Sequence, residues 1–264
     1  MSESTTNTAE ETPVIEVRDL VTHYGTRKIL QGSDMDVRRG EIMVIMGGSG
    51  SGKSTLLRHL IGLKEPAEGE IWYGDTNFTT AAQNERDAVL RNVGVLFQSG
   101  ALYSSLTLAE NVSLPLEQFA PELNPPELRE LSSLKLALVG LKGFEDFYPS
   151  EISGGMRKRA GLARALALDP EVLCVDEPSA GLDPISSKLL DELIVELRDS
   201  LGTTVVIVTH ELASIFDIAT TSVFLDVNTR TMTALGHPAE LRDHSDDPAV
   251  REFLNRGVVP GGVQ

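Results

Sequence analysis

The chain has 264 residues, which is enough for one sizeable hydrophobic core with a subdomain and too few for two full-size enzymatic domains. Its 41% hydrophobic and 23% charged residues are typical of a folded globular protein. The formal net charge of -16 argues against a nucleic-acid partner, because an acidic chain repels phosphate backbones.

Strands are predicted near the start of the chain. Residues 1–12 are rich in Ser, Thr and Glu and have the composition of a disordered tail. Residues 14–21 alternate apolar and polar side chains, as a half-buried strand does, and a second strand is expected at 29–37. The short apolar run at 41–46 predicts a buried strand that leads into a series of glycines.

A helical pattern then begins at Lys53, and a further strand is predicted at 69–72. Residues 85–169 are predicted to be mainly helical and form a candidate subdomain. The last stretch, 237–264, is polar.

Two compact apolar runs, 172–175 and 205–208, are separated by a predicted helix at 186–199. A strand, a helix and a strand at this spacing predict an α/β fold with a parallel sheet and helices on its faces. Cys174, the one cysteine, lies in the first of these runs, so we expect a buried core residue in a reducing compartment.

No apolar run approaches the roughly 20 residues that a membrane-spanning helix needs. The first residues also lack the basic and apolar regions of a signal peptide. We therefore expect the chain to stay inside the cell, and a partner to hold it at any membrane where it works.

Glycines, a lysine and hydroxyl residues follow the strand at 41–46 in the P-loop pattern, with Gly47, Gly52, Lys53 and Ser54 at the defining positions. Such a loop points backbone N–H groups at phosphate oxygens, and the helix that it opens favours the same negative charge. Lys53 would reach the β- and γ-phosphates, and the Ser54 hydroxyl would bind Mg²⁺. The candidate ATP-binding residues here are Gly47, Gly48, Ser49, Gly50, Ser51, Gly52, Lys53, Ser54 and Thr55.

Two adjacent carboxylates, Asp176 and Glu177, end the apolar run at 172–175. Carboxyl ends of strands are where open α/β sheets bind ligands. Asp176 is a candidate Mg²⁺ ligand, largely through water, and Glu177 is a candidate catalytic residue that orients and polarises an attacking water. The pair is weak evidence by itself and gains its meaning from the P-loop.

A third segment, Ile152-Ser153-Gly154-Gly155-Met156, resembles the signature motif of ABC ATPases. Tyr24 resembles the aromatic residue that stacks on adenine, Gln98 the Q-loop glutamine that touches the metal, and His210 the switch histidine. Asp183 lies in a segment that resembles the D-loop. Taken singly, Tyr24, Gln98 and His210 would each more often be surface or structural residues, but order and spacing match over most of residues 14–235.

The resemblance implies an ABC ATPase core with a parallel sheet, an N-terminal antiparallel β subdomain and a helical signature subdomain. The domain would span residues 13–240, with the helical part at about 85–168, and a tail at 241–264 that crosses to a second copy. The resemblance also implies a composite site, in which Ser153, Gly154 and Gly155 of one copy close over ATP on the P-loop of another. Met156 departs from the family's usual glutamine, which puts any role of that amide in doubt.

A narrower resemblance is to the MlaF-type ATPases of Mce-linked phospholipid transport, the toluene-tolerance family. It is carried by residues 95–103, 151–159, 176–184 and 248–254. It implies an integral membrane permease, an Mce-type lipid-binding protein and a STAS-domain regulator as partners, at the cytoplasmic face of the bacterial inner membrane. Residues 101–106 are a candidate docking surface or, equally, internal packing. Another transporter class, or a non-transport ATPase of iron–sulfur assembly, stays open as an alternative.

Overall fold

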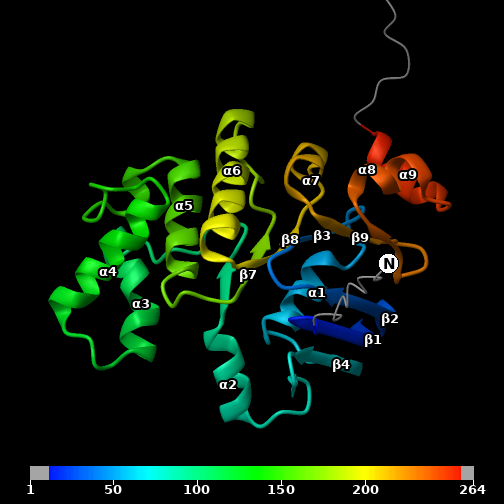
Figure 1. Ribbon diagram of the computed structural model, residues 1–264, viewed down its shortest axis with the longest axis horizontal. Helices are drawn as coiled ribbons and strands as arrows, with labels where there is room; N and C mark the ends of the chain where they lie inside the picture. Colours follow the sequence, from blue (N-terminus) through cyan, green and yellow to red (C-terminus); the bar gives the residue numbers. More distant parts are fainter. Residues whose placement is uncertain (1–11, 257–264) are drawn as a thin grey trace, which may run out of the picture.

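The computed structural model describes residues 12–256, which form two β-sheets surrounded by helices (Figure 1). The smaller sheet is antiparallel, with the order β2–β1–β4–β5, and contains β1 (Ile15–Tyr24), β2 (Arg27–Val37), β4 (Glu68–Tyr73) and β5 (Thr76–Asn77). The larger sheet has the order β10–β9–β3–β8–β7–β6 and contains β3 (Ile42–Met46), β6 (Val93–Leu96), β7 (Val172–Asp176), β8 (Thr204–Val208), β9 (Thr221–Leu225) and β10 (Met232–Gly236). Its strands pair in parallel, except β9 with β10.

The helices divide into groups by position. Those of the first half of the chain are α1 (Lys53–Leu60), α2 (Gln83–Arg91), α3 (Leu108–Phe119) and α4 (Pro125–Leu138). Those of the second half are a 3₁₀ turn (Pro149–Glu151), α5 (Gly154–Ala165), α6 (Pro184–Leu201), α7 (Leu212–Ile218), α8 (Pro238–His244) and α9 (Pro248–Asn255). Figure 1 shows α3, α4 and α5 gathered at one end of the molecule, with the antiparallel sheet at the other.

Two hydrophobic cores lie on opposite faces of the larger sheet. All five side chains of β3 are buried, and they alternate between the cores. Ile42 and Val44 pack with the helices α3 to α7, whereas Met43 and Ile45 pack with α1 and the antiparallel sheet. A strand that is covered on both faces must be apolar throughout, which is why β3, β7 and β8 read as continuous hydrophobic runs.

The predicted α/β architecture and antiparallel N-terminal sheet are confirmed, and Cys174 is buried as expected. Burial raises the pKa of its thiol to about 12. Residues 85–169, however, contain β6, a strand of the parallel sheet, so the helical layer begins after that strand. The predicted tail at 241–264 contains α9, whose Val250 and Leu254 are buried in this chain's own core.

The predicted disordered tail at 1–12 lies outside the described residues, except for Thr12. The predicted C-terminal tail lies outside them after residue 256. None of the helices within 12–256 is both long and apolar enough to span a bilayer.

Candidate functional site

The glycine-rich loop joins the end of β3 to the start of α1. Gly47 has a φ of 146°, and a Cβ there would clash with the backbone oxygen of Leu225 on β9. Gly52 has a φ of 105° and precedes the first residue of α1. Both positions lie in the region that favours glycine, so the loop geometry explains these two residues of the motif.

Lys53 is the first residue of α1, and its side chain folds back under the loop. Its Nζ donates hydrogen bonds to the backbone oxygens of Gly47, at 2.9 Å, and Gly48, at 3.2 Å. The residue is only 7% exposed, and burial lowers the pKa of its ammonium group against the opposing fields of Glu177 and Asp176. A buried cation therefore lies beneath a loop of backbone amides.

A cavity of about 570 Å³ opens over this loop, which is within the usual range for a small-molecule site. It brings together residues that are up to about 200 positions apart in the sequence. Its walls are formed by Gly47, Gly48, Ser49, Gly50, Lys53, Ser54, Gln98, Glu177, His210, Leu212, Phe253 and Arg256.

Asp176 does not itself line the cavity, but it contacts Ser54, which does. The Ser54 hydroxyl lies 3.1 Å from Oδ1 of Asp176, at the end of β7. Burial raises the pKa of Asp176, and the hydrogen bond from Ser54 opposes this shift. Within residues 12–256 there is no cluster of three or more His, Cys, Asp or Glu side chains that could bind a metal by themselves.

Glu177 extends from β7 into the cavity. Its Oε1 lies 2.9 Å from Nδ1 of His210, whose side chain is 57% exposed. Its Oε2 is buried and has no hydrogen-bond partner among the described residues. The backbone of Glu177 is in the left-handed region, with a φ of 45°, which is uncommon for a residue with a side chain.

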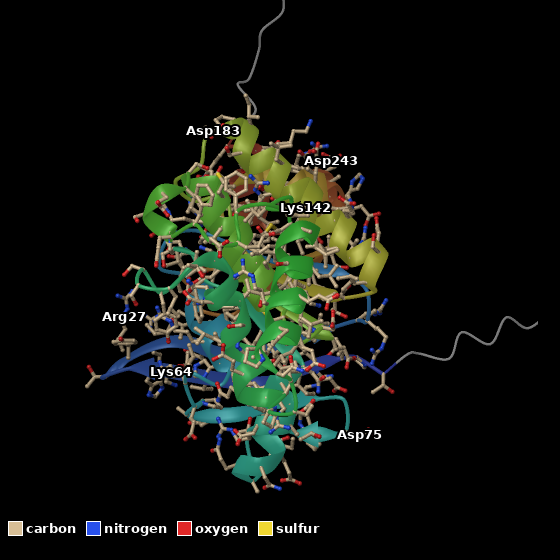
Figure 2. The ribbon with its side chains drawn as sticks, turned by 90° about the vertical axis from the view of Figure 1, so that its left-hand side faces the viewer. Arg27, Lys64, Asp75, Lys142, Asp183 and Asp243 are labelled. Carbon is tan, nitrogen blue, oxygen red and sulfur yellow. The ribbon has the colours of Figure 1, made fainter. Side chains whose placement is uncertain are left out.

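Not every predicted ATP-binding residue reaches the cavity. Ser51, Gly52 and Thr55 lie outside its walls, although they shape the loop and the first turn of α1. Tyr24 ends β1, is 68% exposed and has Nζ of Lys64 at 5.0 Å from its ring centroid. Figure 2 shows Lys64 and Arg27 at the edge of the antiparallel sheet that carries this tyrosine.

The predicted signature and D-loop residues lie at helix N-termini, apart from this chain's own cavity. The Ser153 hydroxyl caps α5 by accepting a hydrogen bond from the Met156 amide at 3.2 Å. The Asp183 carboxylate caps α6 by accepting hydrogen bonds from the amides of Ile185 and Ser186. Figure 2 shows Asp183 toward the top of the molecule, on the same side of the view as Arg27. Both helix starts are accessible to a second molecule.

Three residues of the cavity wall were not predicted from the sequence: Leu212, Phe253 and Arg256. Phe253, on α9, packs against Phe224 of β9 with ring centroids 5.4 Å apart. This contact places the end of α9 at the cavity wall. The helical spacing of Val250, Phe253 and Leu254 was the signal that could have revealed an additional helix here.

The chain is similar to proteins of one family. Residues 30–180 match the family model described as ABC transporter. The chain is 40% identical over 251 residues to the probable ribonucleotide transport ATP-binding protein mkl of Mycobacterium leprae, covering 94% of this chain and 71% of that protein. It is 38% identical over 250 residues to the intermembrane phospholipid transport system ATP-binding protein MlaF of Escherichia coli, covering 95% and 91%.

Solved structures of ATP-binding cassettes are also similar to this chain. A dimeric post-hydrolysis state of the ATP-binding cassette MJ0796, bound to ADP and Pi, superimposes with a TM-score of 0.76 at 28% identity, covering 84% of this chain and 98% of that one. The cbiO1 subunit of the cbiONQ transporter complex from Clostridium perfringens superimposes with a TM-score of 0.80 at 27% identity, covering 93% and 95%.

Proposed function

Because the chain belongs to the ABC transporter family and is an ATPase, we propose that its cavity binds and hydrolyses ATP with Mg²⁺ to drive phospholipid transport. The observation that carries the proposal is the meeting of Lys53, Glu177 and His210 around one cavity that opens over the glycine-rich loop.

The loop would hold the phosphates of ATP. Backbone amides of residues 47–52 and the N-terminus of α1 supply partial positive charge at one wall of the cavity. Lys53 would exchange its bonds to the Gly47 and Gly48 oxygens for bonds to phosphate oxygens. Tyr24, exposed at the edge of the antiparallel sheet, would stack on the adenine.

The oxygen groups of Ser54, Asp176 and Gln98 fit Mg²⁺, which prefers oxygen ligands and retains several waters. The Ser54 hydroxyl and the Asp176 carboxylate are hard oxygen donors that already touch, and Gln98 adds an amide oxygen at the cavity wall. When bound, Mg²⁺ would neutralise phosphate charge.

Glu177 and His210 would act on the hydrolytic water and the γ-phosphate. The Oε2 atom of Glu177 is buried and unpaired among the described residues, so it can accept a hydrogen bond from water and orient it for in-line attack. His210 holds the other carboxylate oxygen at 2.9 Å and remains exposed toward the cavity, where it can bind a phosphate oxygen.

The site would be completed by a second copy of the chain. Ser153, Gly154 and Gly155 open α5 outside this chain's own cavity, and the amides of such a helix start suit a phosphate of another subunit. Asp183, at the start of α6, would communicate across the interface. The structural relative bound to ADP and Pi is described as a dimer, which supports this arrangement.

Phospholipid is the proposed cargo because the similarity to MlaF extends over nearly the whole of both chains. A ribonucleotide, as in the name of the mycobacterial relative, is the second candidate. The partners would be an integral membrane permease, an Mce-type lipid-binding protein and a STAS-domain regulator, with this chain at the cytoplasmic face of the inner membrane.

The permease would dock beside the Gln98 loop. A groove of about 410 Å³ there is lined by side chains that include Phe97, Tyr103, Phe119 and Arg164. Tyr103 is 60% exposed and would be available to a permease, whereas Leu102 packs on the core.

Two variants test the ATPase assignment. Glu177→Gln should bind ATP but lose turnover, giving a stable ATP-bound dimer on size exclusion; near-normal hydrolysis would overturn the role of Glu177. Lys53→Ala should lose ATP binding in calorimetry, and unchanged affinity would count against the cavity as the nucleotide site.

The cargo is tested by what purifies with a tagged chain from detergent-solubilised membranes. A permease together with an Mce-type protein and bound phospholipid is the expected result. A soluble iron–sulfur scaffold, or a permease that responds to ribonucleotides, would replace the phospholipid proposal.

A further inference from the structure

Lys158 is a buried basic residue to which the mechanism above assigns no part. It lies on α5, one turn after Ser153–Gly155, and is 5% exposed. Its Nζ donates a hydrogen bond to the backbone oxygen of Glu177 at 3.2 Å. Burial lowers the pKa of its ammonium group, against the fields of Asp176 and Glu177. Burying a cation is unfavourable unless it is well paired, so this placement requires an explanation.

The peptide groups around Glu177 hold an uncommon conformation. With a φ of 45°, Glu177 occupies the left-handed region, which side chains destabilise and which persists only when surrounding contacts enforce it. Its amide donates to the Val208 oxygen at 2.8 Å, and its oxygen accepts from the Ala180 amide at 3.2 Å. Lys158 is the side chain that holds the same oxygen, and it comes from a different structural layer.

We propose that Lys158 is a positioning residue that keeps Glu177 in its left-handed conformation, so that the Glu177 carboxylate points into the cavity and toward His210. This inference rests on the proposed hydrolytic function. It has a structural consequence, because α5 then contributes to two sites. Its N-terminus closes the site of the second copy, and Lys158 orients the carboxylate of its own site.

Single substitutions separate positioning from folding. Lys158→Met keeps the apolar stem and removes the donor, whereas Lys158→Gln keeps an N–H donor without the charge. The matched control is Lys135→Met. Lys135 is also a buried lysine, 4% exposed, but it lies on α4, pairs with Asp169 and does not line the cavity.

The expected result for Lys158→Met is a fall in kcat of about 10- to 100-fold, because small misplacements of a reacting group have effects of that size. The KM for ATP and the ATP stoichiometry in calorimetry should change little. Lys158→Gln should recover part of kcat, and Lys135→Met should leave it unchanged.

A kcat that is unchanged in Lys158→Met, or that falls only in proportion to ATP-binding stoichiometry, overturns the proposal. If Lys158→Met does not fold, Lys158→Gln decides in the same assay: a reduced kcat at unchanged ATP-binding stoichiometry supports positioning, and an unchanged kcat or a loss equal to that of bound ATP overturns it.

Mixed dimers then identify the site on which Lys158 acts. Two copies with different tags are purified together, so that each dimer retains one active Glu177. In the first dimer, one copy carries Lys158→Met and the other carries Glu177→Gln, which places the substitution in the same chain as the active carboxylate. In the second, one copy carries both substitutions and the other is unaltered, so the substitution lies only on the α5 that closes the active site.

We expect the first dimer to be slow and the second to match a dimer that carries Glu177→Gln alone in one copy. The reverse order, or an equal loss in both, would mean that Lys158 acts through the signature helix or through stability, and would overturn the inference. Hydrolysis by a dimer with Glu177→Gln in both copies would instead refute the proposed catalytic function, so the two failures are distinguishable.

Discussion

The hydroxyl of Ser54 lies 3.1 Å from Oδ1 of Asp176, although the two residues are 122 positions apart in the sequence. The contact joins the first turn of α1 to the end of β7 across the larger sheet. A hydroxyl and a carboxylate held together in this way place two oxygen donors side by side, with Ser54 in the cavity wall.

Asp176→Asn should therefore raise the Mg²⁺ concentration for half-maximal hydrolysis by about 10- to 100-fold, the usual effect of losing an outer ligand of a metal site. Titrating ATPase activity with MgCl₂ at saturating ATP measures it. Glu171→Gln is the matched control, because Glu171 precedes the other end of β7 and pairs with Arg39 at the surface. Equal Mg²⁺ dependence in both variants would contradict the assignment.

Arg256 should contribute to ATP affinity, because it brings a guanidinium to the cavity wall from the end of α9. Its ion pair with Glu252 is long, at 3.6 Å, and its side chain is 61% exposed, so it can turn toward a phosphate. We expect Arg256→Ala to raise the KM for ATP about 3- to 10-fold, as a lost charge-assisted hydrogen bond would. Arg256→Lys should have a smaller effect. A KM that is insensitive to both would place Arg256 outside the site.

Asp191 should make stability depend on pH. It is buried between α6 and α7 and accepts a hydrogen bond from the Ser214 hydroxyl at 2.6 Å. Burial raises its pKa to about 6, with further contributions from Asp217 and Glu211. The folded protein thus binds this proton more tightly than the unfolded chain, whose Asp titrates near pH 4. The free energy of unfolding therefore falls as the pH rises from about 4 to 6.

Asp191→Asn should remove this penalty. We expect it to stabilise the protein by about 1–2 kcal/mol above pH 6 and to have almost no effect near pH 4. Urea unfolding at a series of pH values measures the difference. Asp75→Asn, at an exposed position outside the surroundings of Asp191, serves as the comparison, and a pH-independent gain in Asp191→Asn would contradict this prediction.

A truncation that removes α9 and one that begins after Arg256 should differ in their effect on stability. Deleting the chain from Asp246 onward removes Val250, Phe253 and Leu254 from the core, so we expect a loss of at least about 3 kcal/mol in stability. A chain that ends at Arg256 retains these contacts and should unfold at nearly the full-length temperature.

The same pair of truncations tests the predicted crossing of the tail. If the segment after Arg256 contacts the second copy, its removal should weaken the ATP-dependent dimer while leaving the melting temperature unchanged. Light scattering of the Glu177→Gln background with ATP measures the dimer. Intact dimerisation and activity in both truncations would refute the crossing.

The elements best predicted from the sequence were those whose local pattern matched their environment. The strands β3, β7 and β8 are buried on both faces and therefore appear as continuous apolar runs next to recognisable motifs. The short strand β6 was not distinguished from the helices around it, because four residues carry no reliable period. The helix α9 was missed because its three buried residues lie in an otherwise polar segment.

The residues of the candidate site likewise include some that the sequence predicted and some that it did not. The glycines, Lys53 and Glu177 were predicted because loop geometry and phosphate chemistry restrict which residues can serve. Arg256 was not, and neither was the contact of Lys158 with Glu177, since both follow from packing between distant elements. Nothing local in the sequence indicates that Lys158 reaches the Glu177 backbone, or that the end of α9 reaches the glycine-rich loop.

The position of β3 in the larger sheet has a consequence for how the protein is made. Its neighbours are β8 and β9, at residues 204–208 and 221–225, and Gly47 rests directly against the backbone of Leu225. The glycine-rich loop leaves the ribosome early, yet it cannot be supported until most of the chain has been synthesised. Nascent chains that end before β9 should therefore be unable to retain ATP, and these long-range pairings should make assembly of the site a late, slow step in folding.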